Sequence, residues 1–118
     1  MQVKDVIMFI RSHDKKGPLA HWKDETLCLF IKTCIDHQAF LWASENGKLL
    51  GVAFGRWRPN RVMHVEYMLT LKNCLCKFIK TFLDKFPGTT LIAFRHGKLK
   101  NLTHILEYYG KRNRSTIG

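Results

Sequence analysis

The sequence lacks the features that place many proteins in a class at once. No apolar run approaches the ~20 residues that a membrane-spanning helix needs. The N-terminal segment MQVKDVIMFIR has an acidic residue in its middle and no small-residue cleavage site, unlike a signal peptide. There is no Walker loop, no dinucleotide-binding fingerprint and no Ser-His-Asp order. We therefore expect a soluble, cytoplasmic protein without a membrane partner.

The four cysteines lack the spacing of a zinc site. Cys28 and Cys34 lie six residues apart in a helical stretch, and Cys74 and Cys76 flank a single residue. No CxxC pair is matched by a second pair at zinc-site spacing. On a helix, Cys74 and Cys76 would point roughly 200° apart and could not share a metal ion. We expect four buried, reduced thiols and no metal site.

Acidic residues are scarce, with nine Asp and Glu against 20 Lys and Arg and a net charge of +11. Residues 1–54 carry seven bases and six acids, whereas residues 55–118 carry thirteen bases and three acids. Such a basic half attracts polyanions, which here means nucleic acid, the phosphates of CoA or an acidic protein surface. The alternative is a solvated surface that serves solubility, although such surfaces normally mix the two signs of charge.

The N-terminal third predicts two helices. At 118 residues, the chain can form one domain that buries about two-thirds of its unfolded surface, but not two domains. Asp24 is the expected N-cap of the second helix. The apolar residues that repeat at helical spacing are Val3, Val6, Ile7 and Ile10 in the first helix, and Leu27, Phe30, Ile31, Cys34 and Ile35 in the second.

The hydrophobic period then changes to two, which is typical of strands. Ala39–Ser44 and Lys48–Trp57 are predicted strands, and the Asn46-Gly47 pair between them is a strong hairpin signal. Gly51 and Gly55 indicate a bulge or a close backbone approach in the second of these strands. The sequence therefore predicts an antiparallel hairpin at the centre of the domain.

The C-terminal half predicts strand, helix, strand and helix in turn. The expected segments are Val62–Leu69, Asn73–Phe86, Thr89–Phe94 and Leu99–Tyr109. A strand–helix–strand unit requires a parallel pair with a right-handed crossover. Ligands in such folds often lie where the first strand ends and the crossover helix begins, which is here the junction Leu69 to Cys76. The prediction is an α+β domain of order α-α-β-β-β-α-β-α over residues 1–112, mostly antiparallel with one parallel crossover, followed by a basic tail, 113–118.

This order resembles the GNAT superfamily of N-acetyltransferases. The crossover helix is followed by Pro87-Gly88, and the last predicted helix ends in Tyr108-Tyr109-Gly110. The resemblance implies that acetyl-CoA lies between two splayed strands, its pyrophosphate on backbone amides at the start of the crossover helix. It also implies transfer of an acetyl group to an amine. Small acetyltransferase-like proteins of phage virions look similar, which implies a place inside a virion if a phage encodes the chain.

The chain departs from the family pattern [Gln/Arg]-x-x-Gly-x-[Gly/Ala] at the helix start. Leu71 stands in the first position, and Cys74 and Cys76 stand where the family has small residues. Leu106 occupies the position of the family's tyrosine, and the family's first strand and closing hairpin are missing. Asn73, as the expected N-cap, would occupy amides that an anion needs. The resemblance thus implies a degenerate cofactor site of Leu69, Leu71, Lys72, Asn73, Cys74, Leu75, Cys76 and Lys77.

Glu66 is the candidate catalytic residue, with His64 beside it. The resemblance implies that a carboxylate on this strand deprotonates the acceptor amine through water. The alternative is that these side chains pair with Arg56, Arg58 or Arg61 on the adjoining strand. Strict alternation predicts Val62, His64, Glu66 and Met68 on one face, and Met63, Val65, Tyr67 and Leu69 on the opposite, buried face.

A basic turn supports a second hypothesis. The segment Arg56-Trp57-Arg58-Pro59-Asn60-Arg61 combines three arginines with a tryptophan, which suits phosphate contacts and base stacking. Trp57 could instead close the core beneath the turn. The chain would then be a non-catalytic basic module that binds nucleic acid or packs in a virion or homo-oligomer, with open sheet edges completed by neighbours. The expected contact residues are Arg56, Trp57, Arg58, Arg61, Lys98, Lys100, Lys111, Arg112 and Arg114.

Overall fold

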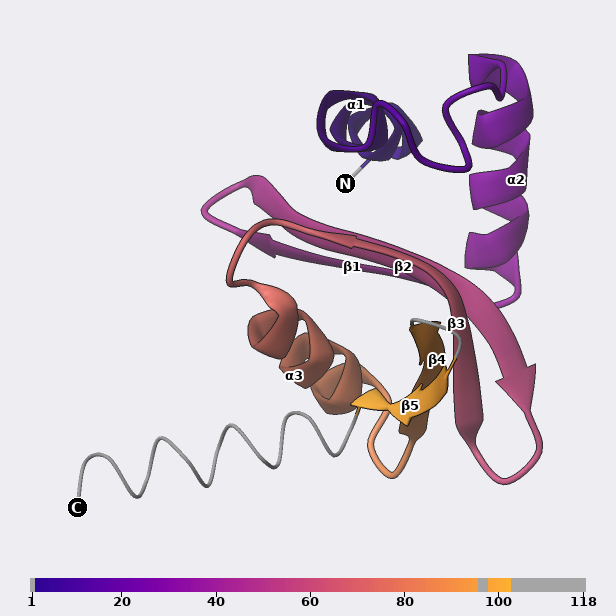
Figure 1. Ribbon diagram of the computed structural model, residues 1–118, viewed down its shortest axis with the longest axis vertical. Helices are drawn as coiled ribbons and strands as arrows, with labels where there is room; N and C mark the ends of the chain where they lie inside the picture. Colours follow the sequence, from indigo (N-terminus) through magenta and orange to yellow (C-terminus); the bar gives the residue numbers. More distant parts are fainter. Residues whose placement is uncertain (1, 96–97, 103–118) are drawn as a thin grey trace.

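A computed structural model describes residues 2–95 and 98–102, which form an α+β fold with three helices and one mixed sheet (Figure 1). α1 and α2 lie on one face of the sheet and α3 lies on the other. None of these three helices is long and apolar enough to cross a membrane. The helices are α1 (Val3–His13), α2 (Asp24–Asp36) and α3 (Leu75–Lys85). The strands are β1 (Phe40–Glu45), β2 (Lys48–Arg58), β3 (Val62–Thr70), β4 (Thr90–Arg95) and β5 (Lys98–Asn101).

The described strands lie side by side in the order β1-β2-β3-β4-β5. β1, β2 and β3 are antiparallel, β3 and β4 are parallel, and β5 returns antiparallel to β4. The predicted crossover is therefore confirmed, and α3 makes the connection. The coarse class, α+β with one parallel pair, is also confirmed.

The helix predicted over Leu99–Tyr109 is wrong at its start. Residues 98–101 form β5, and Arg95 pairs with Lys98 in the antiparallel ladder. The segment Lys98-Leu99-Lys100 alternates polar and apolar residues, so its local pattern also fits a strand. Pairing with β4 satisfies backbone groups that would otherwise lie at a sheet edge. Positions 103–109 of the predicted helix, and the tail, lie outside the described residues.

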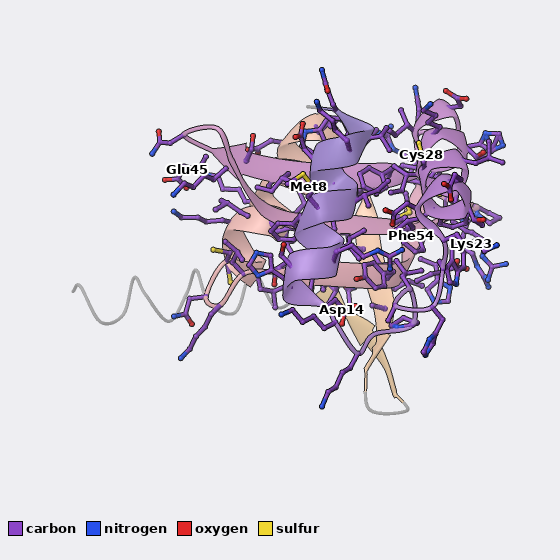
Figure 2. The ribbon with its side chains drawn as sticks, turned by 90° about the horizontal axis from the view of Figure 1, so that it is seen from above. Met8, Asp14, Lys23, Cys28, Glu45 and Phe54 are labelled. Atoms are coloured by element: carbon purple, nitrogen blue, oxygen red, sulfur yellow. The ribbon has the colours of Figure 1, made fainter. Side chains whose placement is uncertain are left out.

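Two apolar clusters hold the layers together, one on each face of the sheet. Met63, Val65 and Leu91 pack against the buried face of α3. Phe40, Val52 and Phe54 pack against α1 and α2. Seen from above, α1 crosses the strands and Phe54 lies near α2 (Figure 2). The amphipathic helices predicted from the sequence thus cover both faces of the sheet.

The start of α2 differs from its prediction. Lys23 is the N-cap, and Asp24 is the first residue of the helix and lies in its first turn. The Asp24 carboxylate pairs with the Arg11 guanidinium of α1, at 3.1 Å. Because Asp24 joins two helices through this ion pair, it is not the residue that caps α2.

The glycines of β2 behave as predicted. A Cβ on Gly55 would lie 2.1 Å from the His64 carbonyl oxygen, and a Cβ on Gly51 would lie 2.9 Å from Cδ2 of Phe78. The strand register shifts near both, between Phe54 and Gly55 against β3, and opposite Gly51 against β1. The Asn46-Gly47 hairpin is confirmed as well, since both residues have positive φ, 53° and 77°.

The register shift at Gly55 creates a β-bulge in β3. Phe54 pairs with Tyr67 and Gly55 pairs with Val65, so Glu66 is the extra residue. A bulge reverses the alternation of side chains that follow it. Val65 belongs to the cluster beneath α3, whereas Tyr67 belongs to the cluster beneath α1 and α2. Tyr67 is buried as expected, but the predicted alternation is wrong beyond Glu66, and Met68 packs on the α3 side.

We expect Gly55→Ala to destabilise the fold by about 3 kcal/mol, because the added Cβ meets backbone rather than a movable side chain. Gly47→Ala is the matched control. Nothing lies within 4 Å of its Cβ position, and only the positive φ is unfavourable, at about 1 kcal/mol. Urea unfolding of both variants measures the difference. Equal losses of unfolding free energy in the two variants would contradict the close approach of β2 and β3.

Candidate functional site

β3 and β4 pair over only part of their length. Val62–Val65 align with Thr90–Ala93, whereas β3 continues to Thr70 and β4 continues to Arg95. No pair between the two strands is seen beyond Val65 and Ala93, although both continuations lie in the described part of the chain. The strands therefore part where the Glu66 bulge begins, since a bulge bends and twists its strand.

A cavity of about 250 Å³ occupies this opening, and we call it the β3–β4 cleft. Its lining comprises Leu75 at the start of α3, Ala93 of β4, Thr70, and residues 65–68 of β3. The cleft thus lies beside the junction between strand and helix that the sequence indicated. It brings Glu66 and Leu75 to one place.

The start of α3 leaves backbone amides uncapped. The Leu71 N–H donates to the Leu50 carbonyl at 2.8 Å, and the Cys74 N–H donates to the Leu71 carbonyl at 3.1 Å. Cys74 is the N-cap, and its side chain makes no capping hydrogen bond. The first three helical N–H groups, those of residues 75–77, precede the first helical hydrogen bond, from Phe78 N to Cys74 O. The predicted Asn73 cap is wrong, because Asn73 adopts a left-handed turn with φ of 65° before the helix.

Several predicted cofactor residues point elsewhere. Leu69 and Leu71 pack against the cluster beneath α1 and α2, on the sheet face opposite α3. Lys72 is exposed, and the Lys77 ammonium lies 3.0 Å from a Glu45 carboxylate oxygen. This hydrogen bond and charge raise the pKa of Lys77 above its ordinary value. Glu45 lies at the end of β1 next to the hairpin (Figure 2).

All four cysteines are free and half-buried, which is less burial than predicted. Cys74 and Cys76 flank the start of α3, and Cys28 and Cys34 belong to α2. Within residues 2–95 and 98–102, no group of three or more His, Cys, Asp or Glu side chains is placed to hold a metal ion. The structure thus offers free thiols rather than a disulfide.

Glu66 forms an ion pair with the Arg56 guanidinium, which is the alternative that the sequence left open. The pair is exposed, with 68% of the Arg56 side chain and 37% of the Glu66 side chain accessible. His64 is opposite Arg56 in the register and does not line the β3–β4 cleft. Glu66 is therefore the candidate base that reaches the cleft, and His64 is not brought to it.

A second hollow, of about 520 Å³, lies on the α2 side of the bulge, and we call it the α2 hollow. Its lining includes Phe30, Cys34, Phe54, Arg56, Trp57 and Glu66. Burial and, to a smaller degree, the Glu66 charge raise the pKa of the Cys34 thiol. Glu66 lines both this hollow and the β3–β4 cleft. No sequence pattern indicates the hollow, because apolar spacing predicts which residues are buried but not where space is left between them.

Tyr67 makes a polar contact that the sequence did not reveal. Its hydroxyl donates to Oδ2 of Asp14 at 2.7 Å, across a sequence separation of 53 residues. Burial, this hydrogen bond and the Asp14 charge all raise the pKa of Tyr67. The contact ties β3, next to the bulge, to the segment that follows α1.

The basic turn is largely engaged in internal contacts. The Trp57 ring lies 6.4 Å from the Phe82 ring and 5.5 Å from the Phe86 ring, and its N–H donates to the Gln38 carbonyl. Arg61 donates to the Pro87 carbonyl at 2.6 Å. Arg58 is exposed. Lys98 and Lys100 belong to β5, and Lys111, Arg112 and Arg114 lie outside the described residues.

We expect Tyr67→Phe to cost about 2 kcal/mol, because it leaves the Asp14 carboxylate without its donor. Since folding raises the pKa of Tyr67, its contribution to stability is complete below about pH 10 and declines as the pH rises further. Unfolding free energies from pH 8 to pH 11 should fall more steeply in the wild type than in Tyr67→Phe. Parallel curves would contradict the buried hydrogen bond.

No protein-family model, curated protein or solved structure matches the chain.

Proposed function

We propose that the chain is a small acetyltransferase-like domain that binds acetyl-CoA in the β3–β4 cleft and moves its acetyl group to an amine. The observation that carries this proposal is the parting of β3 and β4 at the Glu66 bulge, beside the start of α3. The parting opens a cavity that a carboxylate and a helix N-terminus both border. This is the arrangement implied by the resemblance to N-acetyltransferases.

The free edge of β3 suits an extended ligand that contains amides. Residues 66–70 continue the strand beyond its last pair with β4, so the edge of β3 that faces away from β2 borders the cleft instead of a paired strand. An extended ligand can add to such an edge through backbone hydrogen bonds. The pantetheine arm of CoA carries two amide groups and is long and narrow. It therefore fits the shape and the chemistry of this edge.

The start of α3 suits a pyrophosphate. Uncapped N–H groups and the helix dipole place about half a positive charge at this end. Lys72 and Lys77 add formal charge nearby. Two features argue for a weak site. Glu45 forms an ion pair with Lys77, and half-buried cysteines, Cys74 and Cys76, stand where the resembled family has small residues. We infer weak binding, in keeping with a degenerate cofactor site.

Glu66 is the proposed general base. Glu66 is among the residues that line the cleft and also the α2 hollow, so we propose that its carboxylate accepts a proton from an amine placed between them. Arg56 holds the carboxylate in the unliganded chain, and an incoming ammonium would take the place of the guanidinium. Acetyl-CoA supplies the acetyl group as an activated thioester: the amine nitrogen bonds to the acetyl carbon, the C–S bond breaks, and CoA leaves as its thiolate, which solvent protonates. The Tyr67 hydroxyl donates to Asp14, so it is not positioned to give a proton to the leaving thiolate.

We expect millimolar acetyl-CoA to raise the melting temperature by mass action on the folded state. Glu66→Gln should keep this shift and lower the rate of acetyl transfer to primary amines about 100-fold, as loss of a general base does. Glu45→Gln is the matched control. It frees Lys77 and should strengthen binding about threefold without lowering the rate. An unchanged melting temperature in every variant would overturn the proposal.

The charge distribution favours a second candidate, a non-catalytic basic module for nucleic acid or for packing in an assembly. Residues 55–118 carry the whole excess of charge apart from a single unit, and Arg58 stands exposed at the β2–β3 turn. Phosphate contacts are strongly salt-dependent because counterions are released. This candidate requires no cleft.

We expect duplex DNA to bind at low salt, with the logarithm of affinity falling linearly against the logarithm of salt concentration. Fluorescence anisotropy measures this slope. Arg58→Gln should weaken binding and reduce the slope by about one unit, whereas Lys4→Gln in α1, far along the chain from the basic half, should leave both unchanged. DNA binding without any acetyl-CoA shift favours this candidate over the enzyme.

A further inference from the structure

The α2 hollow is the larger of the two spaces that Glu66 borders, and its chemistry defines an occupant. We propose that it binds the acceptor amine, and that this amine is a small monoamine carrying an aromatic or bulky hydrocarbon group. The inference rests on the proposed acetyl transfer and names its substrate class.

The walls of the hollow are aromatic and held in place. Phe30 meets Phe54 edge to face at 4.9 Å, and Phe54 stacks on Tyr67 at 5.0 Å. Trp57 is held by the stacking of its ring on the Phe82 ring of α3 and by the hydrogen bond that its N–H donates to the Gln38 carbonyl. Small residues, Ala39 and Gly55, leave the space between these rings open. At about 520 Å³ the hollow lies within the range of small-molecule pockets, and a hydrocarbon group would bury apolar surface there.

The charge in the hollow suits one ammonium group. Glu66 is the acidic residue among its described lining residues, and Arg56 and His37 are the basic ones. The Cys34 thiol adds no negative charge, because burial and the Glu66 charge raise its pKa. A single ammonium can replace Arg56, which is mostly exposed and loses little on release. A second ammonium group on the same ligand would have no acidic partner among the described lining residues, and the net charge of +11 on the chain would repel it.

The position of the hollow places the amine near the proposed cofactor. Glu66 is among the residues that line both spaces, so the proposal places an ammonium paired with its carboxylate next to the β3–β4 cleft. A larger cavity of about 750 Å³ lies between α1 and the β1–β2 hairpin, lined by Met8, His13 and Trp42 among others. It shares none of its described lining residues with the cleft. An amine bound there would not reach Glu66.

Cys34 provides a direct test that does not need acetyl-CoA. We expect 2-phenylethylamine to slow alkylation of Cys34 by iodoacetamide at least fivefold, as located by mass spectrometry. Cys28 is the internal control, since it lies on the same helix, is also half-buried, and is not among the residues that line the hollow. Spermidine and a blocked lysine tripeptide should protect neither thiol. Equal protection by spermidine or by the peptide would overturn the proposed substrate class.

A pair of variants tests the location. Thr33 lines the hollow and is exposed, so Thr33→Trp should fill the space without unfolding the chain. Lys32→Trp, one residue earlier and outside the lining, is the matched control. Thr33→Trp should weaken 2-phenylethylamine binding at least tenfold by calorimetry, and Lys32→Trp should not change it. Binding that survives Thr33→Trp, with native circular dichroism, would overturn the location.

The outcomes separate this inference from the proposed function. If 2-phenylethylamine protects Cys34 but is never acetylated, the transferase fails and the hollow stands as an amine-binding site. If the chain acetylates spermidine while Cys34 stays unprotected, the transferase stands and the assignment of the hollow is wrong. Acetylation of 2-phenylethylamine that is lost in Thr33→Trp and kept in Lys32→Trp supports both.

Discussion

The close approach of β2 and β3 at Gly55 is the constraint on which the candidate site depends. The strands come so near that a Cβ on Gly55 would overlap the His64 carbonyl. At the same place the register shifts by one residue, and Glu66 is left without a partner residue in β2. The bulge bends β3 away from β4, turns Tyr67 toward α1, and leaves a carboxylate at the point of parting. The bulge at Glu66 thus accounts for the β3–β4 cleft, for the acidic residue beside it, and for the opposite directions in which Val65 and Tyr67 point.

The helices and strands were largely predictable because each has a strong period or a turn with specific chemistry. Asn46-Gly47 and the helical spacing in α3 are examples, since both signals are local. The errors occur where a non-local interaction decides. Asp24 forms an ion pair with Arg11 of α1 instead of capping α2. Leu99 lies in a strand because the edge of β4 was available for pairing.

The candidate site was only partly predictable. The β3–β4 cleft borders the predicted junction through Thr70 and Leu75, because a parallel crossover places a strand end beside a helix start. The faces of Leu69 and Tyr67 could not be predicted, since a bulge shifts the alternation without changing the apolar pattern. The Tyr67–Asp14 hydrogen bond could not be predicted, because the two residues are 53 positions apart and no local pattern links them. The α2 hollow depends on how aromatic rings fit together, which composition does not specify.

Two exposed ion pairs border the proposed binding sites, Glu45 with Lys77 and Glu66 with Arg56. Exposed pairs contribute typically only 0 to about 1 kcal/mol, so exchanging one partner for a ligand costs little. Opening either pair would expose the charge that the proposed ligand needs. This is a cation, Lys77, at the start of α3 for a phosphate, and an anion, Glu66, at the bulge for an ammonium. The two ion pairs therefore keep both charges compensated, and each proposed ligand would enter by replacing one partner of an existing pair.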